Sequence, residues 1–454
     1  MERLQGDHRE GEWGSYIIAA IKDRNQVFMN NMEKTRIINV LYHIPPYANY
    51  SSGPRPAVNW DLPDGNWAGI WGYDIPNLFG AEILKRNPGF DYEVWQPDLR
   101  ADKAYSHRFA NGVMHKLFPA ETITRIHGIK KVQEVSSAAL IGELGKAIAP
   151  GTVIHLNAVS GVLNEEIIRQ FPDVPKVINF HSLISAVPWQ GIFKPRKNLL
   201  FNLQNIVRHR ELKRNKKVVF TYNNSRNIAL LGKYPSLGVE RVFTSIDFGY
   251  WVPGNKSQAK ARFNIDASVP VFTLASRLNP LKQVDKVIQT FAKIEKADGG
   301  NFCLLIAGNG EEAYMKYLHQ IAADLEKRDK ARFVGYLTGD EMRTLYQASD
   351  LFISSSTSEG GPTSLIKALA CQVPVFCTRC GGVDDYIEKY GGGALAAAWD
   401  YSSWEVIFRK VLLDTEKQVV FDRELAKDLF SWDTAANQYI RIYEKLSDSC
   451  YKNA

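Results

Sequence analysis

The side chains of this sequence that are best placed to do chemistry lie around Glu359. This carboxylate precedes the glycine pair 360–361 and Pro362, and the segment lies between two apolar runs, 350–353 and 373–376. Apolar runs on either side of a glycine-rich turn predict a buried strand, a turn, a helix and a second buried strand. The pattern therefore predicts an acidic side chain on a loop that leads into a helix.

The start of that helix is a candidate phosphate site. With Gly361 as N-cap and proline in the first helical position, the backbone N–H groups of Thr363, Ser364 and Leu365 would point out of the helix. Such unpaired donors and the helix dipole attract phosphate. A carboxylate beside a phosphate site suits a ligand with both hydroxyls and phosphates, such as a nucleotide sugar. An ordinary strand–turn–helix crossover would give the same pattern, and both interpretations stay open for this segment alone.

Two cations form a second candidate phosphate site. Arg277 and Lys282 follow the apolar run 269–275 directly and precede a helical pattern. A guanidinium binds two phosphate oxygens and an ammonium acts as a point charge, so the pair could hold a diphosphate. Two solvated surface cations are the alternative.

The elements that would position these residues alternate along the second half of the chain. Further strands are predicted at 302–307 and 331–336, and a helix at 341–348. This alternation predicts a parallel, doubly wound sheet, which binds ligands outside the carboxyl ends of its strands. The candidate residues at those ends are Arg277, Lys282, Gly308, Asn309, Gly310, Tyr336, Leu337 and Glu359.

In combination, these motifs resemble those of the family 4 retaining glycosyltransferases, which have the two-domain GT-B fold. The resemblance covers roughly residues 265–390. It rests on Arg277 with Lys282, on 305–310, 333–335, 345–351 and 358–360, on 368–375, and on the glycine pair 381–382. Segments 430–433 and 439–443 also resemble the family, whose last helix crosses back onto the N-terminal domain.

The resemblance implies an α/β chain with two Rossmann-like doubly wound domains that face each other across a cleft. We expect an N-terminal extension at 1–34, an acceptor domain at 35–252, a nucleotide-sugar donor domain at 253–432 and a crossover helix at 433–454. It further implies a bacterial-type enzyme of surface polysaccharide biosynthesis, with a UDP-sugar or a GDP-sugar as donor.

Lys367 departs from the family pattern. The family usually has a second glutamate there, which contacts the nucleotide ribose, and an ammonium cannot accept a hydrogen bond from ribose hydroxyls. Lys367 lies four residues after Thr363 and so faces the same side of the helix as the predicted phosphate site. It could pair with Glu359 or add a cation to the diphosphate.

The first half of the chain is expected to carry the acceptor. Apolar runs predict a second sheet, with strands at 36–42, 92–95, 153–156, 177–180 and 218–222. The long loop after the first strand holds Trp60, Trp67 and Trp71, which could stack on sugar rings or merely anchor the loop to the core. Gly69 and Gly72 resemble the family's glycine-containing turn near the donor phosphates.

His181 directly follows the predicted strand 177–180 and would therefore face the cleft. The family commonly has a histidine at the comparable place, near the donor sugar, so the resemblance makes His181 a catalytic candidate. A histidine after a strand is otherwise more often structural.

Composition and charge limit the other possibilities. The chain has 454 residues, of which 45% are apolar and 23% charged, and a net charge of +7. Basic residues concentrate in the segment 194–217, where apolar residues recur at helical spacing. This segment predicts either a solvated helix face or peripheral contact with an anionic membrane surface. We expect no nucleic-acid partner, because only the net charge would suggest one.

The predicted location is cytoplasmic. No apolar run is long enough to cross a membrane, the N-terminus lacks an apolar signal segment, and five cysteines fit a reduced chain. Cys377 and Cys380 lack the two further ligands of a metal site.

The expected mechanism is electrostatic and needs neither metal nor cofactor. The chain has no Asp-x-Asp motif, so Arg277, Lys282 and the helix start would neutralise the leaving diphosphate. The resemblance implies retention of anomeric configuration, with Glu359 binding donor sugar hydroxyls. Two alternatives remain at this point: a nucleotide-sugar binding subunit without turnover, and an epimerase on the same scaffold.

Overall fold

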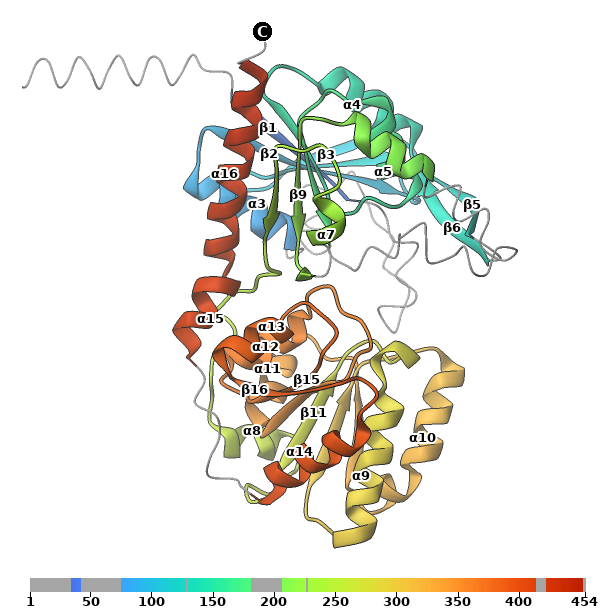
Figure 1. The fold of residues 1–454 in the computed structure, drawn as a ribbon, viewed down its shortest axis with the longest axis vertical. Coiled ribbons are helices and arrows are strands. Elements are labelled where there is room, and N and C mark those ends of the chain that lie inside the picture. Colours follow the sequence, from blue (N-terminus) through green and yellow to red (C-terminus); the bar gives the residue numbers. More distant parts are fainter. Residues whose placement is uncertain are drawn as a thin grey trace, which may run out of the picture.

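The computed structural model describes most of the chain, and its framework consists of two large β-sheets, one mostly and one entirely parallel (Figure 1). The residues described are 34–41, 75–127, 130–180, 206–225, 228–413 and 422–451. Each sheet is flanked by helices and has its own hydrophobic core. The prediction of two doubly wound α/β domains is therefore confirmed.

The N-terminal sheet has eight strands in the order β10-β9-β8-β7-β1-β2-β4-β3. The strands are β1 (Thr35–Val40), β2 (Phe90–Asp98), β3 (Tyr105–Arg108), β4 (Met114–Pro119), β7 (Thr152–Leu156), β8 (Lys176–Phe180), β9 (Val218–Tyr222) and β10 (Gly238–Arg241). All neighbours pair in parallel except β3 with β4. The five strands predicted for this half are present, whereas β3, β4 and β10 were missed because they are short or only partly apolar.

Helices cover both faces of the N-terminal sheet. On one face, α4 (Ala138–Ala147) and α5 (Val162–Gln170) pack against alternate strand residues such as Ile38 and Ile154. On the other face lie α3 (Ile75–Arg86) and the last helix, α16 (Trp432–Tyr451). Because both faces are covered, the central strands are apolar on both sides.

The C-terminal helix α16 crosses back onto the N-terminal domain, as predicted (Figure 1). The hydroxyl of Tyr443 lies 2.7 Å from Nδ1 of His155 in β7, and the amide of Asn179 in β8 donates to the hydroxyl of Tyr439 at 2.9 Å. These polar contacts satisfy groups buried between the helix and the sheet.

The C-terminal sheet has six parallel strands in the order β13-β12-β11-β14-β15-β16. The strands are β11 (Val271–Ala275), β12 (Cys303–Ala307), β13 (Ala331–Gly335), β14 (Leu351–Ser354), β15 (Val375–Thr378) and β16 (Gly393–Ala396). The flanking helices are α8 (Lys256–Arg262), α9 (Val284–Asp298), α10 (Glu312–Lys327), α11 (Gly339–Ala348), α12 (Thr363–Ala370), α13 (Asp384–Tyr390), α14 (Tyr401–Leu413) and α15 (Arg423–Phe430). The neighbours β11 and β14 place the loops that carry Arg277 and Glu359 side by side.

Two features join or extend these domains. Where the chain crosses between the sheets, the amide of Ile246 donates to Phe430 at 2.9 Å and that of Trp432 donates to Ile246 at 3.2 Å. A two-stranded hairpin, β5 (Glu121–His127) with β6 (Lys130–Ser136), extends from the N-terminal domain and was not predicted (Figure 1). Its strands carry mostly polar residues, which gave no strand signal.

Candidate functional site

A cavity of about 610 Å³ lies at the carboxyl ends of the C-terminal strands. Four strand-to-helix loops and the start of α12 supply its walls. The predicted site residues that line it are Arg277, Lys282, Asn309, Tyr336, Leu337, Glu359, Gly361, Thr363, Ser364 and Lys367. The structure thus brings together residues that are spread over about 90 positions of the sequence, as expected at the carboxyl edge of a parallel sheet.

Glu359 and Lys282 form an ion pair inside this cavity. The ammonium nitrogen lies 2.5 Å from Oε1 of Glu359, and the hydroxyl of Ser356 donates to the same oxygen at 2.5 Å. Only 22% of the Lys282 side chain and 14% of the Glu359 side chain are exposed. A partly desolvated pair of this kind can exchange partners with a ligand that brings both anionic oxygens and hydroxyls.

Local backbone structure projects Lys282 towards Glu359. The side chain of Asn279 accepts from the amide of Leu281 at 3.0 Å and starts a single turn of 3₁₀ helix, Pro280–Lys282. The hydroxyl of Ser355 donates to the carbonyl of Lys282 at 2.7 Å. The loop after β11 is therefore tied to the loop after β14 through both backbone and side chain.

Two glycines let the loops after β11 and β12 approach each other. The amide of Leu278 donates to the carbonyl of Asn309 at 2.8 Å. A Cβ atom on Gly308 would lie 1.9 Å from the carbonyl oxygen of Ser276, and one on Gly310 would lie 2.0 Å from that of Leu278. Gly310 does not line the cavity. The need for glycine at this position is explained by the close approach of the two backbones.

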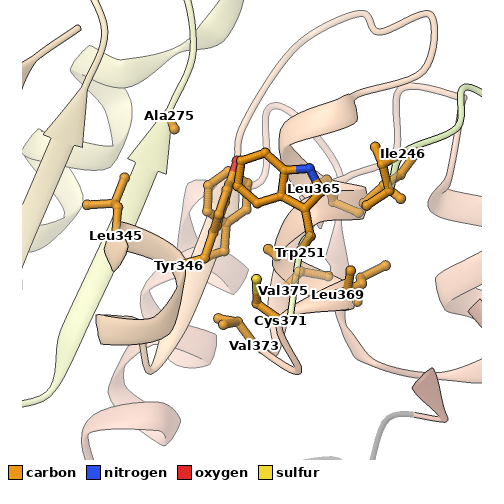
Figure 2. Packing of buried hydrophobic residues seen from close by; sticks show 14 of the residues in the cluster. Ile246, Trp251, Ala275, Leu345, Tyr346, Leu365, Leu369, Cys371, Val373 and Val375 are labelled. Carbon is orange, nitrogen blue, oxygen red and sulfur yellow. The ribbon is translucent and has the colours of Figure 1, made fainter. Parts of the chain in front are cut away.

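Helix α12 begins one residue later than expected. Pro362, not Gly361, is the N-cap, because the Pro362 carbonyl accepts from the amides of Leu365 and Ile366 at 3.1 and 3.2 Å. The amide of Leu365 is therefore already paired, and its side chain points into the apolar core, among residues that include Trp251 and Tyr346 (Figure 2). Within the described structure, Thr363 and Ser364 remain as the helix-start residues that line the cavity.

Lys367 faces the cavity but does not pair with Glu359. Its ammonium lies 4.4 Å from the centre of the Trp251 ring, in a cation–π contact. Burial lowers the pKa of Lys367. Glu359 pairs with Lys282 instead, so the Lys367–Glu359 pair considered from the sequence is not formed.

Several predicted residues lie outside the described part of the chain. These are His181, Trp60, Trp67, Trp71, Gly69 and Gly72, together with residues 1–33 and 194–205.

The N-terminal domain also reaches this site, which the sequence did not reveal. Asn224 is the second residue after β9, and its side-chain amide donates to the carbonyl of Glu359 at 2.8 Å. Arg241, the last residue of β10, donates to Oδ1 of Asp385 at 2.9 Å. The position of Asn224 after the predicted strand 218–222 was the available signal, but an asparagine alone suggests no specific partner. Arg241 gave no signal, because β10 was not predicted.

Among the described residues, no group of three or more His, Cys, Asp or Glu side chains is arranged to hold a metal ion. The thiols of Cys377 and Cys380 are buried, and the neighbouring Cys380 and burial raise the pKa of Cys377. No helix in the described ranges has both the length and the apolar character to cross a membrane.

The C-terminal half of the chain matches a known protein family. Residues 255–428 match the family model described as "Glycosyl transferases group 1". The chain is 26% identical over 215 residues to D-inositol 3-phosphate glycosyltransferase of Saccharomonospora viridis, covering 46% of this chain and 50% of that protein. It is 27% identical over 220 residues to N-acetyl-alpha-D-glucosaminyl L-malate synthase of Bacillus anthracis, covering 46% and 54%. The chain thus spans about half the length of the curated relatives it matches.

Solved structures extend the likeness to the whole fold. Sucrose-phosphate synthase from Thermosynechococcus elongatus aligns over 91% of this chain and 100% of that one, with a TM-score of 0.65 and 16% identity. Anabaena HepE in complex with UDP aligns over 90% and 99%, with a TM-score of 0.62 and 16% identity. Two facing Rossmann-like domains with a returning C-terminal helix define the GT-B architecture. The GT-B fold expected from the sequence is therefore confirmed, and residues 255–428 match the group 1 glycosyltransferase family model, in the half of the chain whose motifs resembled that family.

Proposed function

We propose that this protein transfers a sugar from a nucleoside-diphosphate donor to a glycan or a lipid-linked glycan. The observation that carries the proposal is the convergence of Arg277, Lys282, Glu359 and the start of α12 on one cavity. Cations and helix amides suit a diphosphate, and a carboxylate suits sugar hydroxyls. Relatives described as glycosyltransferases, and the structure of Anabaena HepE in complex with UDP-glucose, support the same assignment.

In the proposed mechanism, the donor diphosphate displaces Glu359 from Lys282. Lys282 and Arg277 then stabilise the charge that grows on the leaving diphosphate, together with the amides of Thr363 and Ser364. The released Glu359 carboxylate accepts hydrogen bonds from donor sugar hydroxyls and orients the ring. Transfer proceeds with retention, by front-face attack in which a diphosphate oxygen helps to remove the acceptor proton. No metal takes part.

The acceptor is proposed to enter from the N-terminal domain. His181 would lie next to the donor sugar, and Trp60, Trp67 and Trp71 would stack on acceptor rings, with Gly69 and Gly72 near the donor phosphates. A membrane surface could hold a lipid-linked acceptor near the cleft. In support, the helix at 206–214 exposes Ile206 and Val207, with 54% and 59% of their surface accessible, beside several basic residues. The proposed location is cytoplasmic, with peripheral membrane contact through 194–217.

The first experiment is a thermal-shift screen against UDP, GDP and their sugar conjugates, followed by an assay of nucleoside diphosphate release with candidate acceptors. A bound donor raises the apparent stability. We expect one nucleotide series to stabilise the protein, and release to require acceptor. Stabilisation without product across all acceptors would favour a binding subunit. Release of free sugar without acceptor would favour the epimerase alternative.

The second experiment adds a chelator to the working assay. We expect turnover to be unchanged, because the chain's own cations neutralise the diphosphate. Loss of turnover that returns with added Mg²⁺ or Mn²⁺ would show that metal independence is wrong.

A further inference from the structure

Asn224 connects the N-terminal domain to two loops of the candidate donor site. The residue is fully buried, and its side-chain amide donates to the carbonyl of Glu359 at 2.8 Å and to that of Cys380 at 3.4 Å. Glu359 lies on the loop after β14 and Cys380 on the loop after β15. One side chain from the first domain therefore bridges two neighbouring loops of the second.

The loops fit closely against this edge of the N-terminal domain. A Cβ atom on Gly381 would lie 2.0 Å from Nδ2 of Asn224, and Gly381 has a φ of +92° that disfavours other residues. A Cβ atom on Gly361 would lie 2.4 Å from Oγ1 of Thr244 in the chain that follows β10. The absence of side chains at these two glycines is what allows the loops to dock.

Arg241 holds the same region from the next strand. Its guanidinium makes a two-pronged contact with the carboxylate of Asp385 and donates to the carbonyl of Gly382 at 2.7 Å. It also lies 4.2 Å from the centre of the Phe243 ring. A bidentate contact fixes orientation as well as distance, so the loop 380–385 is held against the N-terminal domain at several points.

We propose that Asn224 is a positioning residue for the sugar end of the donor. The inference rests on the proposed function. The carboxylate of Glu359 is held from its own domain by Lys282 and Ser356, whereas its backbone carbonyl is held by Asn224 from the other domain. When the diphosphate takes Lys282 away from Glu359, the contact of Ser356 with the carboxylate remains, and the contact of Asn224 with the backbone carbonyl keeps the Glu359 loop in place.

This arrangement separates the two halves of the donor. The nucleoside diphosphate is held by Arg277, Lys282 and the start of α12, all within the C-terminal domain. The sugar is held by Glu359, whose loop depends on docking of the N-terminal domain through Asn224. Loss of Asn224 should therefore weaken recognition of the sugar while leaving the nucleoside diphosphate bound.

The test is Asn224→Asp, which keeps the shape but removes both hydrogen-bond donors and places an anion against two carbonyls. Asn215→Asp is the matched control, because Asn215 is equally buried and donates to the carbonyls of Glu211 and Ile168 at 2.8 and 3.0 Å, away from the cavity. The two ligands are chosen by how much they stabilise the parent protein. One is UDP or GDP, and the other is the glucose, galactose or mannose conjugate of the same nucleotide. Calorimetry then measures the affinity of each variant for both ligands.

We expect Asn224→Asp to weaken nucleotide-sugar binding and to lower donor turnover by about 10-fold or more, with affinity for the nucleoside diphosphate changed by less than about 3-fold. Asn215→Asp should lose thermal stability to a similar extent but keep the parent's ratio of the two affinities. If Asn224→Asp and Asn215→Asp show the same ratio of nucleotide-sugar affinity to nucleoside-diphosphate affinity, the proposal is overturned. A parent that binds none of the probes would instead contradict the proposed function.

A second pair of variants guards against misfolding of Asn224→Asp. Gly381→Ala should lower nucleotide-sugar affinity because its methyl group meets Asn224, and Asn224→Ala opens that space. Adding Gly381→Ala to Asn224→Ala should therefore lower nucleotide-sugar affinity by a smaller factor than Gly381→Ala does in the parent. Strictly additive losses in nucleotide-sugar affinity would show that the loop is not held by Asn224, and would overturn the inference.

Discussion

The ammonium nitrogen of Lys282 lies 2.5 Å from a carboxylate oxygen of Glu359, although 77 residues separate them in the chain. They meet because β11 and β14 are neighbours in the sheet and both loops leave its carboxyl edge. The pair neutralises two charges that would otherwise be partly buried and alone. It also ties the loop after β11 to the loop after β14 at the cavity.

Arg277 and Lys282 should both be needed for donor turnover. We expect Arg277→Ala and Lys282→Ala each to lower kcat/KM for the donor by about 10²–10³, as for removal of a group that stabilises developing charge. The measurement is the initial rate of nucleoside diphosphate release.

Lys286→Ala is the control for these two variants. Lys286 lies on α9 beyond the cavity lining, near Asp285 and the ring of Tyr401. Its substitution by alanine therefore removes one positive charge without changing the residues that line the cavity. Parent-like rates in Arg277→Ala and Lys282→Ala would mean that the phosphate site is elsewhere.

Gly308 should be intolerant of any side chain. It has a φ of +123°, and a Cβ atom would lie 1.9 Å from a backbone oxygen, so we expect Gly308→Ala to lower the free energy of unfolding by about 3 kcal/mol or more. Gly299, at the end of α9, has a φ of +59° with nothing within 4 Å of a Cβ, and Gly299→Ala should cost only about 1 kcal/mol. Urea denaturation measures both, and similar losses would refute the close-contact argument.

Lys176 should give the N-terminal domain a pH-dependent stability. Its ammonium donates to the carbonyls of Phe171 and Val174, and burial lowers the Lys176 pKa to about 7, from an ordinary 10.5. Between these values the unfolded chain binds more protons than the folded one, so stability rises as pH increases.

Lys176→Met removes this dependence. The free energy of unfolding of the parent, relative to that of Lys176→Met, should increase by about 2 kcal/mol between pH 7 and pH 9. Urea denaturation at the two pH values provides the measurement. A pH-independent difference would indicate that the folded-state pKa is not lowered.

The contact between Tyr443 and His155 should contribute to the attachment of α16. Their atoms are 2.7 Å apart and buried, so we expect Tyr443→Phe to cost about 1 kcal/mol and to couple with His155→Ala by a similar amount. Tyr346→Phe is the contrast, because within the described structure the buried Tyr346 hydroxyl has no hydrogen-bond partner. Its removal should be neutral or slightly stabilising, and an equal loss at both tyrosines would contradict the role given to the His155 contact.

Much of the donor half could be predicted from the sequence. The apolar runs that became β11, β12 and β14 are buried on both faces, so composition alone identified them and the loops at their carboxyl ends. Parallel order then required Arg277, Lys282 and Glu359 to share one edge. The start of α12 was predicted one residue too early, because both Gly361 and Pro362 suit a helix terminus and only the backbone hydrogen bonds distinguish them.

The sequence by itself determined the fold class and the side chains available for catalysis, because strand burial and loop position are local properties of apolar patterns and glycine turns. Only the tertiary structure decided which charges pair. It joined Glu359 to Lys282 rather than to Lys367, and placed Lys367 over Trp251. It also brought Asn224 from the other domain onto the Glu359 loop. Such contacts depend on distances of a few ångströms between segments far apart in the chain, which no local pattern records.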